Sequence, residues 1–387
     1  MLPQNDELRE MVATTLQGLE ETLAAELLRL GAQKIEPLKR AVKFQGDLGF
    51  IYKANRSLRT ALRILVPINK FYAANEAGLY DAVKAMPWSE WIGLDQTLAV
   101  HAILVKAPVT HSHFAALKVK DAIVDRIQAD KGKRPSVDTR NPDWSIHVLW
   151  SGDRVQISLD SSGDSLHRRG YKVNQGMAPL NEVLAAGMVM MTHWDGKGDF
   201  IDPFCGSGTL LTEAALIAKN IPANVFRSKY SYQNWPVFDA ALQDKIWDGL
   251  MNRIRDFNYT IYGSDRNGRS VRESQENLEH ALVEDYVQLD TCDFRDVKKT
   301  GPFGFIVTNP PYDKRIAANI EPLYGSIGRW LKHDFPGWNA FILAPDGEVN
   351  ASKHIGLRPN KRVSMVNGSI DCRYLGYQLF KGKKKEQ

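Results

Sequence analysis

A short stretch near residue 310 combines a buried strand with polar and aromatic groups. The apolar run 305–307 contains β-branched residues and is followed by Asn309, Pro310, Pro311 and Tyr312. The run predicts a buried parallel strand, and open α/β sheets bind ligands beyond the carboxyl ends of such strands. The prolines leave nearby carbonyls free to accept hydrogen bonds, Asn309 adds a side-chain carbonyl, and Tyr312 adds a stacking ring. We therefore favour the interpretation that this segment binds a planar base with an exocyclic amine. The alternative is a Pro-rich turn whose tyrosine only packs against the protein.

Methyl transfer to nitrogen is the chemistry that suits these residues. The lone pair of an exocyclic amine is delocalised into the ring, so the amine is a poor nucleophile. Asn309 and the Pro310 carbonyl would hold its two hydrogens and turn the lone pair toward an electrophilic methyl group, which is catalysis by positioning and electrostatics. A cytosine-C5 enzyme would instead need a nearby cysteine nucleophile. Cys205, Cys292 and Cys372 are better interpreted as small buried residues.

A glycine-rich turn at 202–209, D-P-F-C-G-S-G-T, provides a candidate cofactor site. Gly206 and Gly208 allow the backbone to approach a nucleotide-like ligand closely. The turn has neither the Gly-Lys-Ser/Thr of a phosphate loop nor the glycine spacing of a dinucleotide site. Its leading Asp202 suits a positively charged or hydroxyl-bearing ligand better than a pyrophosphate. S-adenosyl-L-methionine, with its α-amino group and sulfonium, fits that polarity.

Two more acids follow the next two predicted strands. Asp265 comes after strand 259–263, where dinucleotide folds hold a ribose diol. Asp293 comes after strand 287–289 and is placed to accept from an adenine amino group. Each acid alone would more often be a helix cap. Three acids at three successive strand ends favour a shared cofactor pocket.

The elements that must position these residues alternate between strand and helix from residue 199 onward, which predicts a doubly wound α/β unit closed by a hairpin at 361–380. Pro179 suits the first turn of a helix that starts near residue 178 and covers the pocket. The insertion 220–257 is rich in aromatics, which would either stack on RNA bases or form a satellite core.

The first 166 residues predict two small α+β units, at 1–68 and 69–166. In the second unit, Lys118 and Lys120 lie near the start of a predicted helix, where the helix dipole does not favour cations. Phosphate contact and a solvated face are both open interpretations. His111 and His113 lack the carboxylates or cysteines that would complete a metal site, so no metal is predicted.

Composition sets broad limits on the function. The chain has 387 residues, 43% hydrophobic, with no apolar run of transmembrane length and no recognisable targeting segment. Three cysteines without C-x-x-C predict a reducing compartment, and we expect a soluble cytoplasmic protein. The net charge of +5 permits nucleic-acid binding, and basic residues gather at 118–140, 168–172 and 361–362.

At this point the sequence resembles known families. The segment 202–209, G-S-D-R-N at 263–267 and T-N-P-P-Y at 308–312 are similar to class I S-adenosylmethionine-dependent methyltransferases. The segments 116–125, 134–138, 141–143 and 166–172 resemble a THUMP RNA-binding domain preceded by a ferredoxin-like domain. Together, nearly the whole chain resembles the bacterial 23S rRNA guanine-N2 methyltransferase family.

The resemblance implies a fold and a set of residue roles. Residues 167–387 would form a Rossmann-like domain with a seven-stranded, mostly parallel sheet, after ferredoxin-like (1–68) and THUMP (69–166) domains. The implied catalytic residues orient and stack the target guanine: Asn309, Pro310, Pro311 and Tyr312. The implied cofactor-binding residues are Met177, Pro179, Asp202, Phe204, Gly206, Gly208, Thr209, Asp265, Asp293 and Asn309. The RNA-binding candidates are Lys118, Lys120, Arg134, Arg168 and Arg169.

The predicted function is therefore guanine-N2 methylation of 23S rRNA, in an incompletely assembled subunit because a paired base must leave its stack. Methylation of tRNA guanine or of adenine N6 is an alternative that the motif does not exclude. Glutamine-N5 methylation of a protein fits the motif but not the two basic N-terminal units. A non-catalytic RNA-binding assembly factor would not need the intact acids and glycines. Some relatives are fused to a second enzyme that makes 7-methylguanosine, and we expect no such activity in this chain.

Overall fold

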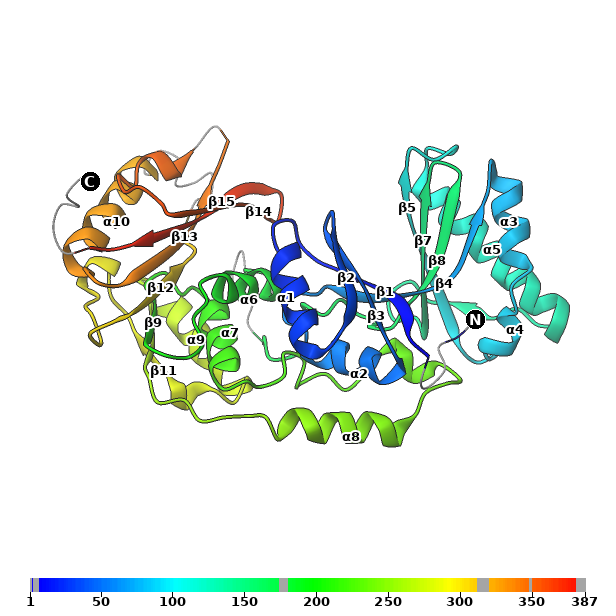
Figure 1. The fold of residues 1–387 in the computed structure, drawn as a ribbon, viewed down its shortest axis with the longest axis horizontal. Coiled ribbons are helices and arrows are strands. Elements are labelled where there is room, and N and C mark those ends of the chain that lie inside the picture. Colours follow the sequence, from blue (N-terminus) through cyan, green and yellow to red (C-terminus); the bar gives the residue numbers. More distant parts are fainter. Residues whose placement is uncertain (1, 3–6, 174–179, 312–319, 348–349, 381–387) are drawn as a thin grey trace.

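The computed structural model describes residues 2, 7–173, 180–311, 320–347 and 350–380, which build two β-sheets flanked by helices (Figure 1). Within these residues no helix is both long enough and apolar enough to cross a membrane. Tyr312, Met177 and Pro179, which the sequence implicates in the site, lie outside the described residues.

The N-terminal half forms one continuous eight-stranded sheet with strand order β2-β3-β1-β4-β8-β7-β5-β6. Its strands are β1 (Arg9–Thr14), β2 (Gln33–Leu38), β3 (Ala41–Gly46), β4 (Arg63–Tyr72), β5 (Thr97–Val105), β6 (Ser136–Val137), β7 (Trp144–Ser151) and β8 (Arg154–Asp160). Its helices are α1 (Glu20–Leu30), α2 (Leu48–Ser57), α3 (Glu76–Lys84), α4 (Trp88–Trp91) and α5 (Ser112–Lys131). The sequence predicted two small α+β units, at 1–68 and 69–166. Antiparallel pairing of β4 with β8 joins the strands of both units into a single sheet.

The C-terminal half forms a seven-stranded sheet with strand order β11-β10-β9-β12-β13-β15-β14. Its strands are β9 (Asp199–Asp202), β10 (Ile261–Ser264), β11 (Val287–Asp290), β12 (Gly304–Thr308), β13 (Asn339–Pro345), β14 (Lys361–Asn367) and β15 (Ile370–Gln378). The first five pair in parallel, and β15 runs antiparallel to both β13 and β14. The predicted doubly wound sheet and closing hairpin are confirmed.

Helices cover both faces of this second sheet because its strands are apolar on both sides. The main ones are α6 (Glu182–Met191), α7 (Thr209–Ala218), α9 (Gly268–His280) and α10 (Ile320–Asp334). The helix expected to start near residue 178 begins only at Glu182. Asn181 caps it by accepting hydrogen bonds from the amides of Val183 and Leu184, at 2.9 and 3.3 Å.

The insertion 220–257 packs against the N-terminal half rather than presenting its aromatics to solvent. It contains a 3-10 turn (Ser231–Asn234) and α8 (Ala240–Met251), which runs along one side of the molecule in Figure 1. Tyr232 is fully buried, with its ring 4.7 Å from that of Tyr52, and Trp235 stacks on Trp144 at 6.5 Å. Of the two interpretations left open by the sequence, the satellite core is the one observed for these rings.

A buried ionic cluster also links the two halves. Arg169 is 1% exposed and lies 3.3 Å from Glu213 of α7, whose carboxylate also accepts from the Tyr171 hydroxyl at 3.1 Å. Arg59, which follows α2, donates to the carbonyls of Leu216 and Ile221. These contacts hold the ferredoxin-like region against α7, the helix that follows the glycine-rich turn.

Candidate active site

The candidate site lies at the carboxyl edge of the seven-stranded sheet. β9 and β12 are neighbours, so the end of the strand that carries Asp202 lies beside the end of the strand that precedes Asn309. The Thr308 hydroxyl donates a 2.7 Å hydrogen bond to Asp202 Oδ1. The structure therefore brings the glycine-rich turn and the Asn-Pro-Pro segment together, as the sequence predicted.

The glycine-rich turn is shaped by two left-handed glycines. Gly206 has φ 54° and Gly208 has φ 78°, a backbone region that favours glycine. A Cβ added to Gly206 would project into open space, which is what a turn that cradles a ligand requires. Gly208 is the N-cap of α7, so the amides of the first helical turn face the same space.

Asp265 and α9 hold the turn in place. Asp265 follows β10 and accepts from the Gly206 amide at 3.2 Å and the Asn267 amide at 2.9 Å. Ser274 donates to the Gly206 carbonyl at 2.6 Å, and Asn277 donates to the Ser207 carbonyl at 2.9 Å. Asp265 is therefore adjacent to the turn, in the position expected for a residue that binds a ligand held there.

Asp202 is electrostatically unusual. Its carboxylate is 1% exposed, and burial raises its pKa to about 7, although hydrogen bonds from Thr308 and the Phe204 amide oppose the rise and the Asp265 charge adds to it. No cation is within ion-pair distance of it among the described residues. A buried carboxylate of this kind favours a ligand that brings its own positive charge.

Three side-chain oxygens at the edge of the site have no hydrogen-bond partner among the described residues. They are Asn309 Oδ1, Thr209 Oγ1 and Ser264 Oγ, all inaccessible to solvent. An unpaired buried polar atom costs about 1–3 kcal/mol, and such atoms are retained where a ligand satisfies them. Together with Asp202 and the open space at Gly206, they fit a cationic ligand with polar groups, such as S-adenosyl-L-methionine.

Asp293 lies further along the same edge, after β11. It accepts from the Arg295 amide at 3.0 Å and forms an ion pair with the Arg295 guanidinium at 2.7 Å, which lowers its pKa. The hydrogen bond from the Arg295 amide shows the helix-cap role that was the alternative for each acid, and the partial exposure of Asp293 leaves the carboxylate accessible. The Phe204 ring packs against the Phe294 ring in a tilted arrangement, with ring centroids 5.1 Å apart.

The RNA-binding candidates are scattered and differ in exposure. Lys118 and Lys120 are half-buried on α5, and Lys120 is paired with Asp121. Arg134 and Arg168 are exposed and lie 2.8 Å from Asp125 and 3.6 Å from Asp164, respectively.

Arg169 is a correction to the sequence prediction. It was expected to face RNA, but its guanidinium is buried against Glu213 and donates to the carbonyls of Leu166 and Arg59. It is therefore a structural residue in this conformation, and no phosphate can reach it.

Sequence reasoning missed the residues that support the site. Thr308 directly precedes Asn309 and was passed over although it belongs to the same motif. Ser274 and Asn277, spaced by three on α9, are buried polar residues on a helix face, and this spacing is the signal that would have revealed them.

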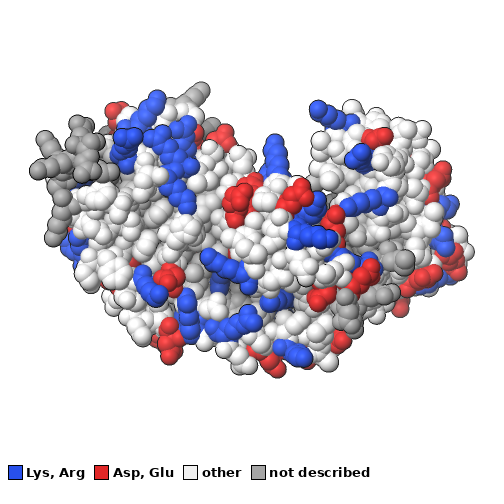
Figure 2. Space-filling model, viewed as in Figure 1, with Lys and Arg blue, Asp and Glu red and all other residues white. Residues whose placement is uncertain are grey.

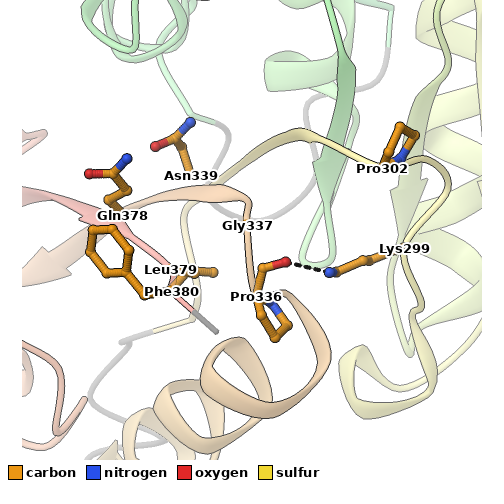
Figure 3. Close-up of a pocket in the computed structure, with 8 residues that line it drawn as sticks. All are labelled: Lys299, Pro302, Pro336, Gly337, Asn339, Gln378, Leu379 and Phe380. Carbon is orange, nitrogen blue, oxygen red and sulfur yellow. Dashed lines mark hydrogen bonds between the residues drawn. The ribbon is translucent and has the colours of Figure 1, made fainter. Parts of the chain in front are cut away.

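A separate cavity in the described part of the chain lies away from the candidate site. It has a volume of about 590 Å³ and is lined by Lys299, Asn339, Gln378 and Phe380, among others (Figure 3). Asn339 begins β13 and Gln378 ends β15, so this cavity is at the amino edge of the parallel strands, opposite the candidate site. No cluster of three or more metal-ligating side chains occurs in the described residues.

The fold and the site are those of a class I methyltransferase domain, which follows an α+β N-terminal half. Residues 169–375 match the RMKL-like methyltransferase domain, residues 73–160 match the THUMP domain, and residues 10–65 match the RlmL ferredoxin-like domain. The chain belongs to the RMKL-like methyltransferase family.

Particular relatives extend this likeness. The chain is 36% identical over 384 residues to ribosomal RNA large subunit methyltransferase K/L of Syntrophotalea carbinolica, with 95% of this chain but 53% of the relative covered. It is 36% identical to a Synechocystis sp. protein provisionally named an RNA methyltransferase, covering 96% and 97% of the two chains. The chain thus spans about half the length of the K/L relative. The crystal structure of SMU.472 in complex with S-adenosylhomocysteine (SAH) superposes with TM-score 0.87 at 28% identity, covering 99% and 100% of the chains.

Proposed function

We propose that this protein uses S-adenosyl-L-methionine to methylate the exocyclic N2 amine of a guanosine in 23S rRNA, in the cytoplasm. The observation that carries the proposal is the pairing of two features at one sheet edge. Asn309 Oδ1 is buried and unpaired among the described residues, and the neighbouring Thr308 is hydrogen-bonded to the buried Asp202. An acceptor for an amine thus adjoins a carboxylate suited to a cationic cofactor.

The cofactor would supply an electrophilic methyl group beside Asn309. Asp202 would bind the α-ammonium group of the cofactor, and the turn at Gly206 would leave room for its methionine part. Asp265 would accept hydrogen bonds from the ribose hydroxyl groups. Asn309 Oδ1 would accept one hydrogen of the target amine, and the Pro310 carbonyl would accept the other. These contacts would orient the lone pair without any covalent intermediate on the protein.

RNA as the substrate is supported by the THUMP match and by the names of the relatives, a large-subunit rRNA methyltransferase K/L among them. Guanine N2 is the finer part of the proposal. Adenine N6 also presents two amine hydrogens, and a structure with TM-score 0.84 and 28% identity is described as a predicted N6-adenine-specific DNA methylase. The base therefore has to be identified by experiment.

The test is mass spectrometry of nucleosides from separated 23S rRNA, 16S rRNA and tRNA, from a strain lacking the gene and its parent. We expect one N2-methylguanosine to disappear from 23S rRNA alone and to return with a plasmid copy. Loss from tRNA, or loss of a methyladenosine, would overturn the substrate assignment. An unchanged set of nucleosides would leave the non-catalytic RNA-binding role or methylation of a protein as the explanation.

A further inference from the structure

The outer edge of the methyltransferase sheet carries cations without acidic partners. β14 is the last strand of the sheet and pairs only with β15. Residues 351–370 contain four basic residues and no Asp or Glu. Three of them are exposed and form no ion pair with any described residue: Lys353, Arg358 and Arg362. We call these three residues the β14 surface.

The fourth basic residue, Lys361, differs from these three because its side chain takes part in the packing of the fold. Its Nζ donates a 2.7 Å hydrogen bond to the Met191 carbonyl at the end of α6, and burial lowers its pKa. Side chains alternate along a strand, so Arg362 points to the opposite side, where its charge acts on Tyr377 of β15. Lys361 therefore stabilises the fold through a hydrogen bond, whereas the Arg362 side chain forms no hydrogen bond or ion pair with a described residue.

Most nearby acids are already occupied. Asp346 lies 2.7 Å from Arg373, and Glu321 lies 3.5 Å from His354. Asp371, on β15, is exposed but forms no ion pair with the β14 surface among the described residues. Figure 2 shows Lys and Arg side chains gathered over the region of β13 and β15 of Figure 1, with a few acidic side chains at the border of the group. The surface is therefore positively charged.

Three exposed or half-buried cations that the sequence singled out for RNA contact differ in this respect, whereas Lys118 has no ion pair with a described residue and lies over the Phe114 ring. Lys120, Arg134 and Arg168 each have a carboxylate within ion-pair distance. An RNA phosphate would have to displace that carboxylate, and the loss of the ion pair would offset part of the binding free energy. At the β14 surface, no carboxylate of a described residue would have to be displaced.

The β14 surface is also close to the candidate site. β12, which leads to Asn309, is separated from β14 by β13 and β15. Three strand spacings of about 4.8 Å place the two strands roughly 14 Å apart. Because η5 (Ala351–Lys353) follows the carboxyl end of β13, Lys353 lies toward the edge that carries the candidate site.

We propose that the β14 surface binds backbone phosphates of the RNA next to the target nucleotide. This inference rests on the proposed function and names a contact surface on the catalytic unit. Unpaired cations also protect edge strands from aggregation, but that role requires no RNA contact and predicts no effect on RNA affinity.

The test compares Arg358→Ala/Arg362→Ala with the unchanged protein in binding to an unmodified 23S rRNA transcript at several salt concentrations. Each phosphate contact to single-stranded nucleic acid contributes about 0.7 to the slope of log K against log salt. Loss of two contacts should reduce the slope by about 1.4, which at 0.1 M salt corresponds to about 25-fold weaker binding. SAH affinity should not change, because neither arginine contacts the candidate cofactor site.

Two further variants make the result specific. Arg358→Lys/Arg362→Lys keeps both charges and should retain the slope. Lys229→Ala/Lys245→Ala removes two exposed cations from the insertion and should bind as the unchanged protein does. The proposal for the β14 surface would be wrong if Arg358→Ala/Arg362→Ala left the slope of log K against log salt unaltered while the unchanged protein still methylated 23S rRNA. Failure of the unchanged protein to bind or methylate 23S rRNA would instead overturn the proposed function.

Discussion

Asp202 makes cofactor binding depend on pH in a way that can be calculated. Its pKa of about 7 in the free protein means that roughly half of the molecules carry a proton there at neutral pH. A cofactor ammonium binds to the carboxylate form, so the proton must leave on binding. The apparent Kd should then rise by a factor of 1 + 10^(7−pH), about 11-fold at pH 6 and about 1.1-fold at pH 8.

Calorimetric titration with SAH measures this directly. Runs at pH 6, 7 and 8, each in two buffers with different ionisation enthalpies, give both Kd and the number of protons released. We expect close to one proton released at pH 6 and close to none at pH 8. Asp202→Asn should bind SAH weakly at every pH and release no proton. A Kd that is constant from pH 6 to pH 8 would refute the assignment of Asp202 as the ammonium-binding group.

The same carboxylate affects stability. Its folded-state pKa is raised above the ordinary value of 3.8, so the folded protein holds a proton that the unfolded chain has lost. Stability contributed by this site is therefore highest below pH 3.8 and is lost as the pH rises toward 7. At about 1.4 kcal/mol per pKa unit, the loss reaches about 4 kcal/mol.

Asp202→Asn should remove this penalty, because the amide can still accept from Thr308. Its free energy of unfolding at pH 8 should exceed that of the parent by up to about 4 kcal/mol, and the difference should shrink toward pH 4. Urea denaturation at the two pH values checks this. A variant less stable than the parent at pH 8 would contradict the reasoning.

Three other substitutions test separate parts of the structure. Asn309→Ala should abolish methyl transfer while RNA affinity stays within about twofold of the parent, and retained methyl transfer would contradict the role proposed for Asn309 Oδ1. Gly206→Val should place a side chain in the open space of the turn and a β-branched residue at φ 54°, so SAH affinity should fall at least tenfold, as measured by calorimetry. Arg169→Ala should leave Glu213 buried without its cation and cost about 3–5 kcal/mol of stability in urea denaturation; a cost below 1 kcal/mol would argue against the buried pair.

The parts of the site that the sequence predicted are those with a local signal. Glycines at a strand-to-helix turn, an acid at its start and two prolines after an apolar run each constrain the backbone within a few residues. Asp202, Gly206 and Asn309 were selected as candidate site residues for this reason. Parallel pairing then brings successive strand ends to one edge without further information.

The parts that were missed depend on distant partners. Arg168 and Arg169 are adjacent and chemically identical, yet one is exposed and the other is buried against Glu213. Nothing within a few residues distinguishes them, because the difference arises 44 residues away on α7. The pairing of β4 with β8 and the burial of Tyr232 against Tyr52 are likewise set by long-range contacts. The sequence shows which residues are charged or aromatic, but it does not show which distant residues they contact.

The insertion and the shared eight-stranded sheet have a consequence for target choice. Tyr232 and Trp235 of the catalytic half are packed into the core of the N-terminal half. This packing holds the two halves at a fixed distance and orientation relative to each other. Under the proposed function, an RNA bound by the THUMP region could present to the candidate site only a nucleotide at one distance and angle from the bound RNA element. Selectivity would then come from the architecture of the RNA, and neighbouring guanosines of identical sequence context would be ignored when they lie off that span.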